Sequence, residues 1–388
     1  MRILHVQGIF SPEHGGPANS LAQYCIGQAS RGQDVSAWVL EGFPGTSPAI
    51  RLPAPVETVA HRVQFPFALG RSSAMRRALS SAKSPDVFHL HGTWLRAMHY
   101  GAEEARRRRV PYLVEAMGMY ESYGLRTKWL RKRLARWWFQ DALLERAQCL
   151  HVNSRREGEQ LRQLGFRNPL AVIPVGVDTA AISSRPVGLT PWPELKGRFF
   201  LFLSRIQEKK GIELLLNAWA KLAQASPDWT LVIGGAGSPE YVAHCRQLAA
   251  DLGIKTQCKW AGHLTEEAKG WALSHADFFV LPSFSENLGN VVAEALAHGT
   301  PVLTTDATPW QEITQRRCGW VTSPTPQALA PALEEAMRHD PRQLKEMGER
   351  GRAWCVSHFA LDRVLEDLDA VYGWMTGASA KPSCVIET

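Results

Sequence analysis

The sequence predicts an α/β protein made of two doubly wound domains, each with a parallel sheet covered by helices on both faces. Three observations support this prediction. Short apolar runs alternate with amphipathic stretches, this alternation occurs in both halves of the chain, and a proline-containing stretch without clear periodicity separates the halves. Strand–helix alternation is typical of parallel sheets wrapped by helices. The length of 388 residues suits two domains of ordinary size.

The apolar runs predict the order of the elements. In the first half we expect strands at 3–6, 34–40, 87–90, 112–115, 149–152 and 171–173, and helices at 17–30, 72–82, 96–109, 126–147 and 154–163. In the second half we expect strands at 199–203, 230–233, 259–261, 278–281 and 301–304, and helices near 211–225, 240–252, 265–274 and 290–298. The domains are predicted at 1–178 and 199–358, with a linker over 179–198, a helical segment over 359–375 and a frayed tail over 376–388.

The overall composition excludes several classes of protein. Apolar residues make up 45% and charged residues 21%, a globular balance that excludes disorder and coiled coils. No apolar run approaches the roughly 18 residues of a transmembrane helix, and the N-terminus reads directly into a strand without a signal region. The seven cysteines are scattered and form no CxxC pair, which predicts reduced thiols in the cytoplasm, without a disulfide framework or a zinc site.

The positive charge is concentrated in the first half. Residues 1–178 contain 24 Lys and Arg against 14 Asp and Glu, whereas residues 179–388 contain 20 against 23. A basic domain beside a nearly neutral one indicates that the first domain meets an anionic partner, such as phosphates, nucleic acid or lipid headgroups. Doubly wound domains bind ligands at the carboxyl ends of their strands, so we expect the chemistry in the cleft between the domains.

The most informative segment begins where the predicted strand 278–281 ends. It reads Pro-Ser-Phe-Ser-Glu-Asn-Leu-Gly over residues 282–289 and continues into the predicted helix 290–298. Glu286 lies in the loop, Gly289 lets the backbone approach a ligand, and the N–H groups at the helix start suit a phosphate. Glu294 lies one turn into the helix, where a carboxylate can accept two ribose hydroxyls. A single glutamate would be taken for a loop cap or a solvated residue, but the whole arrangement favours a ligand site.

This segment resembles the E-x7-E signature of the retaining, nucleotide-sugar-dependent glycosyltransferases of family 4, the group 1 transferases, which have the GT-B fold. The resemblance covers almost the whole chain and includes Gly15-Gly16, the segments 89–92 and 165–178, and Arg205 with Lys210. It implies that the second domain holds the nucleotide sugar, that the first domain holds the acceptor, and that the helix 359–375 crosses back onto the first domain.

The resemblance also implies roles for individual residues. Glu286 would bind hydroxyls of the donor sugar, and Arg205 and Lys210 would bind its diphosphate. The remaining donor contacts would come from Glu294 at the ribose, Gly15 and Gly16 at the phosphates, the backbone near Gly262 and His263 at the base, and Asn287, Leu288 and Gly289.

The chemistry of the reaction agrees with these cations. Breaking the bond between a sugar and a nucleoside diphosphate leaves negative charge on a poor leaving group. Arg205 can offset this charge with its planar guanidinium group, and Lys210 can offset it with the point charge of its ammonium group. Taken alone, Lys210 would equally be a surface lysine. No Asp-x-Asp pair follows a predicted strand, because the only such pair, Asp367 and Asp369, lies in a C-terminal helical pattern. We therefore expect neither a metal nor a cofactor.

Two candidates for the acceptor or sugar side, and two departures from the pattern of the family, complete the comparison. His91 beside Gly92, and Glu115 at the end of a predicted strand, are candidates for the acceptor or sugar side, although a lone histidine is as often structural. The family usually has a histidine after the strand 112–115, where this chain has Met117, and a glycine where it has Ser204. The glycines do not form the G-x-G-x-x-G fingerprint, so a nicotinamide enzyme is not expected.

Residues 126–138 are the densest basic and aromatic stretch of the chain. Aromatic residues among cations on a helix suit the interface of headgroups and acyl chains. We therefore expect contact with an anionic membrane surface, made by Lys128, Trp129, Arg131, Lys132 and Arg136. The alternative is a helix whose apolar stripe packs on its own domain while the cations are solvated.

These observations predict a transferase that moves a sugar from a UDP- or GDP-linked donor to an acceptor hydroxyl with retention of configuration. The expected acceptor is a lipid-linked saccharide in the assembly of lipopolysaccharide, capsule or exopolysaccharide, at the cytoplasmic face of the membrane. One alternative is a soluble transferase that acts on a small metabolite or sugar. The other is a basic nucleic-acid-binding protein, which the missing helix-turn-helix and zinc spacings argue against.

Overall fold

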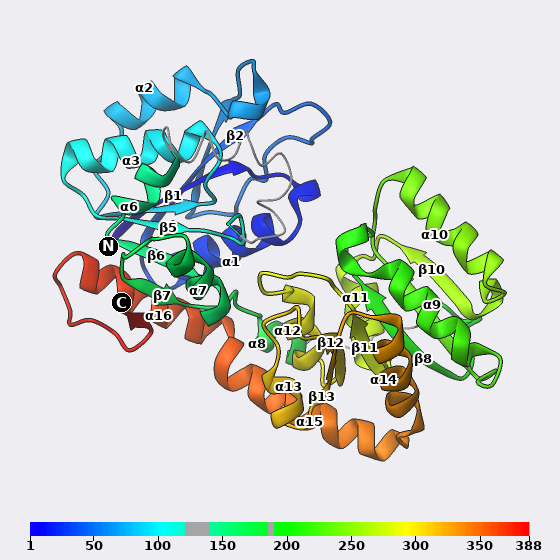
Figure 1. Cartoon of the computed structure of the whole chain (residues 1–388). Helices are drawn as coiled ribbons and strands as arrows, with labels where there is room; N and C mark the ends of the chain where they lie inside the picture. Colours follow the sequence, from blue (N-terminus) through cyan, green and yellow to red (C-terminus); the bar gives the residue numbers. More distant parts are fainter. Residues whose placement is uncertain (121–139, 185–189, 388) are drawn as a thin grey trace. The chain divides into compact units, whose positions relative to one another are not determined.

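The computed structural model describes residues 1–120, 140–184 and 190–387, and the chain folds into two compact units. Unit 1 consists of residues 1–176 together with 361–388, and unit 2 consists of residues 177–360 (Figure 1). Each unit is a twisted sheet of mainly parallel strands with helices on its faces. The predicted class of two doubly wound α/β domains is confirmed.

Unit 1 contains an eight-stranded sheet in the order β14-β7-β6-β5-β4-β1-β2-β3. The strands are β1 (Arg2–Ile9), β2 (Asp34–Glu41), β3 (Glu57–Arg62), β4 (Val87–His91), β5 (Tyr112–Glu115), β6 (Cys149–Val152), β7 (Leu170–Val172) and β14 (Val385–Ile386). The helices are α1 (Gly16–Ser30), α2 (Ser73–Ser81), α3 (Arg96–Arg108), α6 (Asp141–Glu145), α7 (Arg155–Gln163) and α16 (Leu361–Met375), with 3-10 turns η1 (Pro12–His14) and η2 (Phe67–Leu69). All these strands pair in parallel except β14, which is antiparallel to β7.

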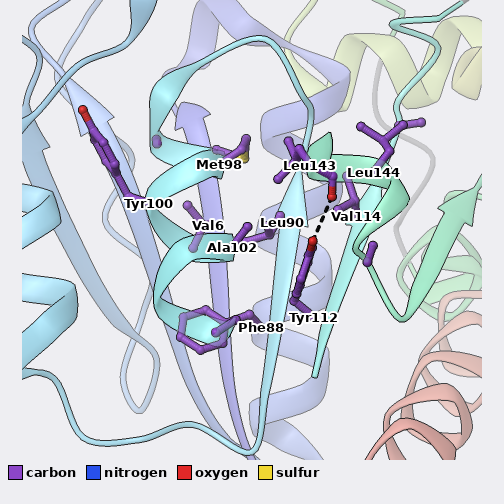
Figure 2. Close-up of a cluster of buried hydrophobic side chains, with 14 of the residues drawn as sticks. Val6, Phe88, Leu90, Met98, Tyr100, Ala102, Tyr112, Val114, Leu143 and Leu144 are labelled. Carbon is purple, nitrogen blue, oxygen red and sulfur yellow. Dashed lines mark hydrogen bonds between the residues drawn. The ribbon is translucent and has the colours of Figure 1, made fainter. Parts of the chain in front are cut away.

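One face of this sheet packs against α3 and α6. Figure 2 shows Leu90 and Val114 of the sheet facing Met98 of α3 and Leu143 of α6. The Tyr112 hydroxyl donates a hydrogen bond of 3.0 Å to the Leu143 carbonyl, so the phenol at the edge of this layer is satisfied (Figure 2). Burying an aliphatic side chain of this size contributes about 1.5–3 kcal/mol, and this layer therefore holds the strands in place.

The other face of the sheet packs against α1 and α16. Leu365 and Leu368 of α16 are buried against Ile3, Leu113 and Ala171 of the strands. The helix α16 follows unit 2 in the sequence but completes the core of unit 1. Unit 1 is therefore assembled from two segments that are far apart along the chain.

The prediction of a frayed tail over 376–388 is wrong for its end. Val385 is 5% exposed and, with Ile386, pairs with Leu170 and Ala171 of β7. An apolar pair beside an open sheet edge gains both hydrogen bonds and burial, which the isolated tail sequence did not reveal.

Unit 2 contains a six-stranded parallel sheet in the order β10-β9-β8-β11-β12-β13. The strands are β8 (Arg198–Leu203), β9 (Trp229–Gly234), β10 (Cys258–Gly262), β11 (Phe278–Leu281), β12 (Val302–Thr305) and β13 (Gly319–Thr322). The helices are α8 (Thr179–Ser184), α9 (Ile212–Ala223), α10 (Pro239–Asp251), α11 (Glu266–His275), α12 (Asn290–Ala297), α13 (Glu312–Gln315), α14 (Pro326–Arg338) and α15 (Pro341–Phe359), with 3-10 turns η4 (Glu208–Lys210) and η5 (Lys255–Gln257).

Aromatic side chains fill the core of unit 2. Phe200 of β8 stacks on Phe278 of β11 with ring centroids 5.2 Å apart, and the Trp219 ring meets Phe200 edge-on at 5.1 Å. Such ring pairs contribute about 0.5–1.5 kcal/mol beyond the area they bury. Phe200 and Phe278 lie on the two central strands, whose ends carry the candidate site, and Trp219 of α9 packs against Phe200.

Most predicted elements agree with the observed ones, and several observed elements were not predicted. The strand β3 was not predicted because it is an edge strand, half-exposed along most of its length and without an apolar run. The strand β13 and the helices α14 and α15 were not predicted either. Within the described part of the chain, none of the helices combines the length and the apolar character that a membrane span requires.

Candidate functional site

The site of unit 2 lies where the order of its strands reverses direction. The strand β8 lies between β9 and β11, so the chain runs outward from β8 in both directions. In open α/β sheets, ligands bind at this switch point, outside the carboxyl ends of the strands. The loops that follow β8 and β11 carry Lys210 and Glu286 respectively, and these residues are thus placed on neighbouring strand ends.

These two loops are joined through their backbones. Gly211 directly precedes α9 and has φ of 70°, and a Cβ at this position would lie 2.1 Å from the Pro282 carbonyl oxygen. Only glycine permits both that φ and that approach. The Phe284 N–H also donates a hydrogen bond of 2.9 Å to the Lys209 carbonyl. Contacts within the protein therefore hold the loops in one arrangement.

Lys210 and Glu286 form an ion pair across the two loops. The Nζ atom of Lys210 donates to Oε1 of Glu286 at 2.5 Å, and the two side chains are 12% and 7% exposed. The Ser283 hydroxyl donates to the same oxygen at 2.6 Å. The Ser283 carbonyl in turn accepts a hydrogen bond of 2.6 Å from the Thr305 hydroxyl on β12. Glu286 is thus fixed by a cation and a hydroxyl, and Ser283 is a contributor that the sequence did not single out.

The loop after β11 leads into the start of α12. Gly289 precedes the helix with φ of 74°, in the left-handed region that favours glycine. Leu288 is 5% exposed, and its carbonyl accepts a hydrogen bond from the Trp310 indole N–H. Asn287 is half-buried in the same turn. The first N–H groups of α12 therefore stand at the edge of the site, where the helix dipole favours an anion.

Glu294 lies within α12 and is held by a lysine of the neighbouring helix. The Lys269 ammonium on α11 donates to Oε1 of Glu294 at 3.2 Å and also pairs with Glu266. Burial favours the neutral form of Lys269, but the two carboxylates outweigh it and raise its pKa. One oxygen of Glu294 is thus engaged, and its side chain remains 28% exposed. No pattern in the sequence pointed to Lys269.

Three further predicted residues lie at strand ends of unit 2. Arg205 follows β8, is exposed, and has no ion pair among the described residues. Gly262 ends β10 with φ of 67°, and His263 follows it, both exposed. The Gly262 carbonyl accepts a hydrogen bond of 2.7 Å from the Gly235 N–H of the adjacent loop. The predicted donor residues that follow the strands of unit 2 thus stand at the same edge of the sheet, and Lys210 and Glu286 are paired with each other.

In unit 1, Gly15 and Gly16 lie at the start of α1, after β1. Gly15 has φ of 62° and ψ of −126°, and a Cβ there would meet open space. Gly16 is exposed. The backbone conformation, and not close packing, requires glycine at position 15. The Gly15 N–H donates a hydrogen bond of 3.1 Å to the Pro12 carbonyl, so this glycine closes the turn that leads into α1.

His91 and Glu115 do not face solvent, contrary to the expectation for substrate-facing residues. Their side chains are 1% and 0% exposed, and Nδ1 of His91 lies 2.6 Å from Oε2 of Glu115. The Asn153 amide donates to the other Glu115 oxygen at 3.2 Å. The strands β4 and β5 place both side chains on the face that α1 and α16 cover. Direct contact with an acceptor is therefore not available to them in this structure.

The neighbourhood of His91 contains further buried histidines. His5, His89 and His91 form one group, and His89, Glu115 and His151 form another, with possible ligand atoms within 4.8 Å of one another in each. That spacing would admit a metal ion. The ring nitrogens, however, are engaged in hydrogen-bond contacts with one another and with neighbouring side chains.

Met117 and the basic stretch 126–138 are the remaining features that the sequence analysis singled out. Met117, at the position where the resembled family has a histidine, has φ of 52°. This left-handed conformation is uncommon for a residue other than glycine and is associated with strain at functional loops. The stretch 126–138, with Lys128, Trp129, Arg131, Lys132 and Arg136, lies outside the described residues, so its contact with a membrane stays a prediction.

Two doubly wound units, the second with a polar site at its switch point, define the GT-B class of α/β protein. Two family models match the chain in agreement with this division. The model for glycosyl transferases group 1 matches residues 192–354, and the model for the glycosyl transferase 4-like domain matches residues 15–176. The chain belongs to the group 1 glycosyltransferases of the GT-B fold, and the resemblance stated from its motifs is confirmed.

Curated relatives carry names from the same family. The D-inositol 3-phosphate glycosyltransferase of Jonesia denitrificans is 28% identical over 251 residues, which are 60% of this chain and 58% of that protein. The phosphatidyl-myo-inositol mannosyltransferase of Mycobacterium leprae is 31% identical over 216 residues, 54% of each chain. The lipopolysaccharide core biosynthesis mannosyltransferase LpcC of Rhizobium leguminosarum bv. viciae is 28% identical over 65% of this chain and 68% of that protein. The matches thus span about half to two thirds of each relative.

Solved structures show the same fold over nearly the whole chain. The Anabaena protein HepE, solved in complex with UDP and glucose, superposes with a TM-score of 0.76 at 19% identity and covers 96% of this chain and 100% of that one. Sucrose-phosphate synthase from Thermosynechococcus elongatus has a TM-score of 0.77 at 20% identity and covers 98% and 100%. Identities this low show the fold alone.

Proposed function

We propose that the chain transfers a glycosyl group from a nucleoside diphosphate sugar to an acceptor hydroxyl, with the donor bound by unit 2. The observation that carries this proposal is the ion pair between Lys210 and Glu286, which lie at adjacent strand ends at the switch point of that sheet. A cation and a carboxylate side by side match the two halves of such a donor, because the diphosphate is anionic and the sugar presents hydroxyl donors.

Lys210 and Arg205 bind the diphosphate in this proposal. Lys210 is neutralised by Glu286 in the absence of ligand, whereas Arg205 is exposed and has no ion pair within the described residues. Negative charge grows on the phosphate as the bond to the sugar breaks, so fixed cations stabilise the transition state more than the ground state. The N-terminus of α12 adds a partial positive charge beside them.

Glu286 and Glu294 bind hydroxyl groups. Glu286 accepts from the donor sugar, and its orientation is set beforehand by Ser283 and Lys210. Glu294 accepts from the ribose through the oxygen that Lys269 does not hold. Both carboxylates act as hydrogen-bond acceptors, and no residue in this scheme serves as a covalent nucleophile. We propose that the leaving phosphate assists attack from the same face, which retains the anomeric configuration.

The fixed cations support a reaction that needs no metal. The diphosphate, which a divalent ion would otherwise bind, has Arg205, Lys210 and a helix terminus as partners in the proposal. We likewise place the phosphates near Gly15 and Gly16 on the resemblance to the family, and the nucleoside base near Gly262 and His263. The base itself, uracil or guanine, is left to experiment.

We propose a lipid-linked saccharide as the acceptor, bound by unit 1, in the assembly of a surface polysaccharide. The concentration of Lys and Arg in the first half of the sequence supports this class, since such an acceptor is anionic and lies at a charged membrane face. The names of relatives that act on phosphatidyl-myo-inositol or in lipopolysaccharide core biosynthesis support it too. The enzyme would then work at the cytoplasmic side, attached peripherally.

Donor hydrolysis tests the proposal most directly. Purified protein is incubated with a panel of UDP- and GDP-linked sugars, and release of the nucleoside diphosphate is measured with and without chelator. One donor should be hydrolysed by the wild type and not by Lys210→Ala, whereas Lys221→Ala, an exposed lysine on α9, should behave like wild type. Hydrolysis of no donor, together with no thermal stabilisation by UDP or GDP, would refute the proposed function.

A further inference from the structure

A continuous chain of polar contacts runs through the buried interior of unit 1. It crosses the sheet from β6 to β4, passes to α16 and α1, and returns through β1 and β4 to β5. Its members are the Ile173 carbonyl, His151, His89, Tyr372, Gln28, His5, His91 and Glu115. Every side chain in it is at most 3% exposed. Buried polar groups are stabilising only when each of them has a hydrogen-bond partner.

The distances along the chain define seven contacts. His151 Nε2 lies 2.8 Å from the Ile173 oxygen, and its Nδ1 lies 3.4 Å from His89 Nε2. His89 Nδ1 lies 2.8 Å from the Tyr372 hydroxyl, which is 3.3 Å from the Gln28 amide nitrogen.

On the other arm, Gln28 Oε1 lies 2.8 Å from His5 Nε2, and His5 Nδ1 lies 2.8 Å from His91 Nε2. His91 Nδ1 completes the chain at 2.6 Å from Glu115. Both ends of the chain, a backbone carbonyl and a carboxylate, accept hydrogen bonds and cannot donate.

Counting hydrogens shows that four neutral rings and an ionised Glu115 cannot satisfy this chain. Each contact needs one hydrogen. A neutral imidazole supplies one, so four histidines supply four, the Tyr372 hydroxyl supplies one, and the Gln28 amide supplies one toward the chain. Six hydrogens are therefore available for seven contacts. Turning the Gln28 amide around does not change the count, because the amide still donates on one side and accepts on the other. Without one further proton, two lone pairs would face each other at one of these contacts in a dry interior.

We propose that unit 1 contains a buried proton-binding site, in which His91 carries the seventh hydrogen as an imidazolium paired with an ionised Glu115. All seven contacts then become hydrogen bonds, running from His91 outward to Glu115 on one side and to the Ile173 carbonyl on the other. The pair has no net charge, so its burial avoids the cost of an isolated ion.

The surroundings favour His91 over the other members of the chain. Burial lowers the pKa of His5 to about 3 and lowers the pKa values of His89 and His151 as well, so these rings stay neutral. Burial would raise the pKa of Glu115, but the neighbouring histidines and the hydrogen bonds to the carboxylate outweigh burial and lower that pKa. The Asn153 amide donates to the other Glu115 oxygen, which favours the ionised carboxylate, so we assign the proton to His91.

The groups that face this pair come from every element packed around it. They are His5 of β1, His89 of β4, His151 and the following Asn153 at β6, Tyr24 and Gln28 of α1, and Tyr372 of α16, with Asp369 acting on Tyr372 from the same helix. The Tyr24 hydroxyl is buried but has no hydrogen-bond partner among the described residues. Tyr24 lies beside His91 without belonging to the chain, which makes it a suitable control.

The proposed proton stabilises contacts between elements that are remote in sequence. Gln28 and Tyr372 connect α1 and α16 to the central strands, and both are oriented by the direction in which the hydrogen bonds run. Loss of the proton would turn one contact into a repulsion between lone pairs. We therefore expect the docking of α16 to weaken at high pH, in a part of the molecule that touches no substrate in the proposed reaction.

Nitrogen NMR of the full chain, labelled in its histidines, tests the proposal on the wild type alone. At pH 7.5 the assigned His91 ring should have hydrogens on both nitrogens, while His5, His89 and His151 of the chain, and the separately buried His99, have one hydrogen each. In Glu115→Gln the amide donates to His91 Nδ1 and keeps Asn153 as the donor to its oxygen, so seven hydrogens serve seven contacts without an added proton. The doubly protonated signal should disappear. A singly protonated His91 ring in the wild type would overturn the proposal.

Hydrogen exchange of β4 and β5 gives a second measurement, local to unit 1. An unfolded histidine titrates near pH 6.5, so above about pH 7 the folded state holds one proton that the unfolded chain has lost. One proton corresponds to a tenfold change in the unfolding equilibrium per pH unit. Between pH 7 and 8.5, protection should fall about tenfold per unit more steeply in wild type than in Glu115→Gln. Thiols and other titratable groups are present in both proteins, so their contributions cancel when the two pH dependences are compared.

A tyrosine variant and a metal analysis complete the test. Tyr24→Phe should keep the wild-type pH dependence, because its phenol lies outside the chain; loss of the dependence in this variant would overturn the assignment to His91. Elemental analysis of the purified protein should find no stoichiometric transition metal. One bound metal ion per chain would also overturn the proposal, since a metal would then supply the missing positive charge.

Discussion

Replacing Lys210 by alanine should weaken binding of a nucleoside diphosphate far more than binding of the free nucleoside. A hydrogen bond to a charged group contributes about 1.5–3 kcal/mol, so the lost contact predicts roughly a 10- to 150-fold weaker affinity for UDP or GDP. The variant also leaves the carboxylate of Glu286, 7% exposed, without its cation, while the Ser283 hydroxyl still donates to it. This carboxylate then repels the diphosphate, which places the expected loss at the upper end of this range.

A double variant separates the two contributions. In Lys210→Ala with Glu286→Gln the repulsion is absent, so the affinity for the diphosphate should recover part of the loss, while the single Glu286→Gln keeps the cation. Isothermal titration of each variant with the nucleoside and the nucleoside diphosphate provides the four corners of the cycle. Equal losses of affinity for nucleoside and nucleoside diphosphate in Lys210→Ala would refute the reasoning and make Lys210 a structural residue.

Three further outcomes are expected. Glu286→Gln should raise the barrier to transfer by about 2–4 kcal/mol, and turnover within threefold of wild type would contradict its role at the donor sugar. Leu368→Ala, at a fully buried position of α16, should destabilise unit 1 by about 2–5 kcal/mol in chemical denaturation; an unchanged transition would show that α16 is dispensable. The wild type should co-sediment with anionic vesicles at low salt, at about 1 kcal/mol per basic residue at the surface, and not with neutral vesicles. Replacing Lys128, Arg131, Lys132 and Arg136 by glutamine should abolish vesicle binding while donor hydrolysis persists. If the wild type does not bind anionic vesicles, a soluble acceptor is favoured.

The site of unit 2 was the part of the molecule most accessible from sequence. Parallel strands place their carboxyl ends at one edge, so the residues that follow strands could be assigned to a common site from the sequence pattern alone. The pairing of Lys210 with Glu286 could not be foreseen, because it depends on how two loops approach at Gly211. Lys269 escaped notice because it lies mid-helix on α11, and only the packing of α11 beside α12 brings it to Glu294.

Unit 1 shows the opposite case. The alternation of apolar runs located its central strands, but His91 and Glu115 were expected to face a ligand, because each stands at the end of a predicted strand. Whether a strand end is open depends on which helices cover it. Here one of the two covering helices is α16, which lies more than 200 residues further along the chain. Covering of this kind has no local signature.

The division of unit 1 into two segments has a consequence for biosynthesis. The ribosome makes residues 1–176, then all of unit 2, and only then the helix α16 that covers Ile3, Val87 and Leu113. At translation rates of about 5–20 residues per second, the delay amounts to roughly 10–40 s. During that time the part of the apolar sheet face that α16 covers remains exposed, while unit 2 has its full sequence and can fold. The nascent chain is thus exposed to aggregation or chaperone capture at its older end, and its first domain closes last.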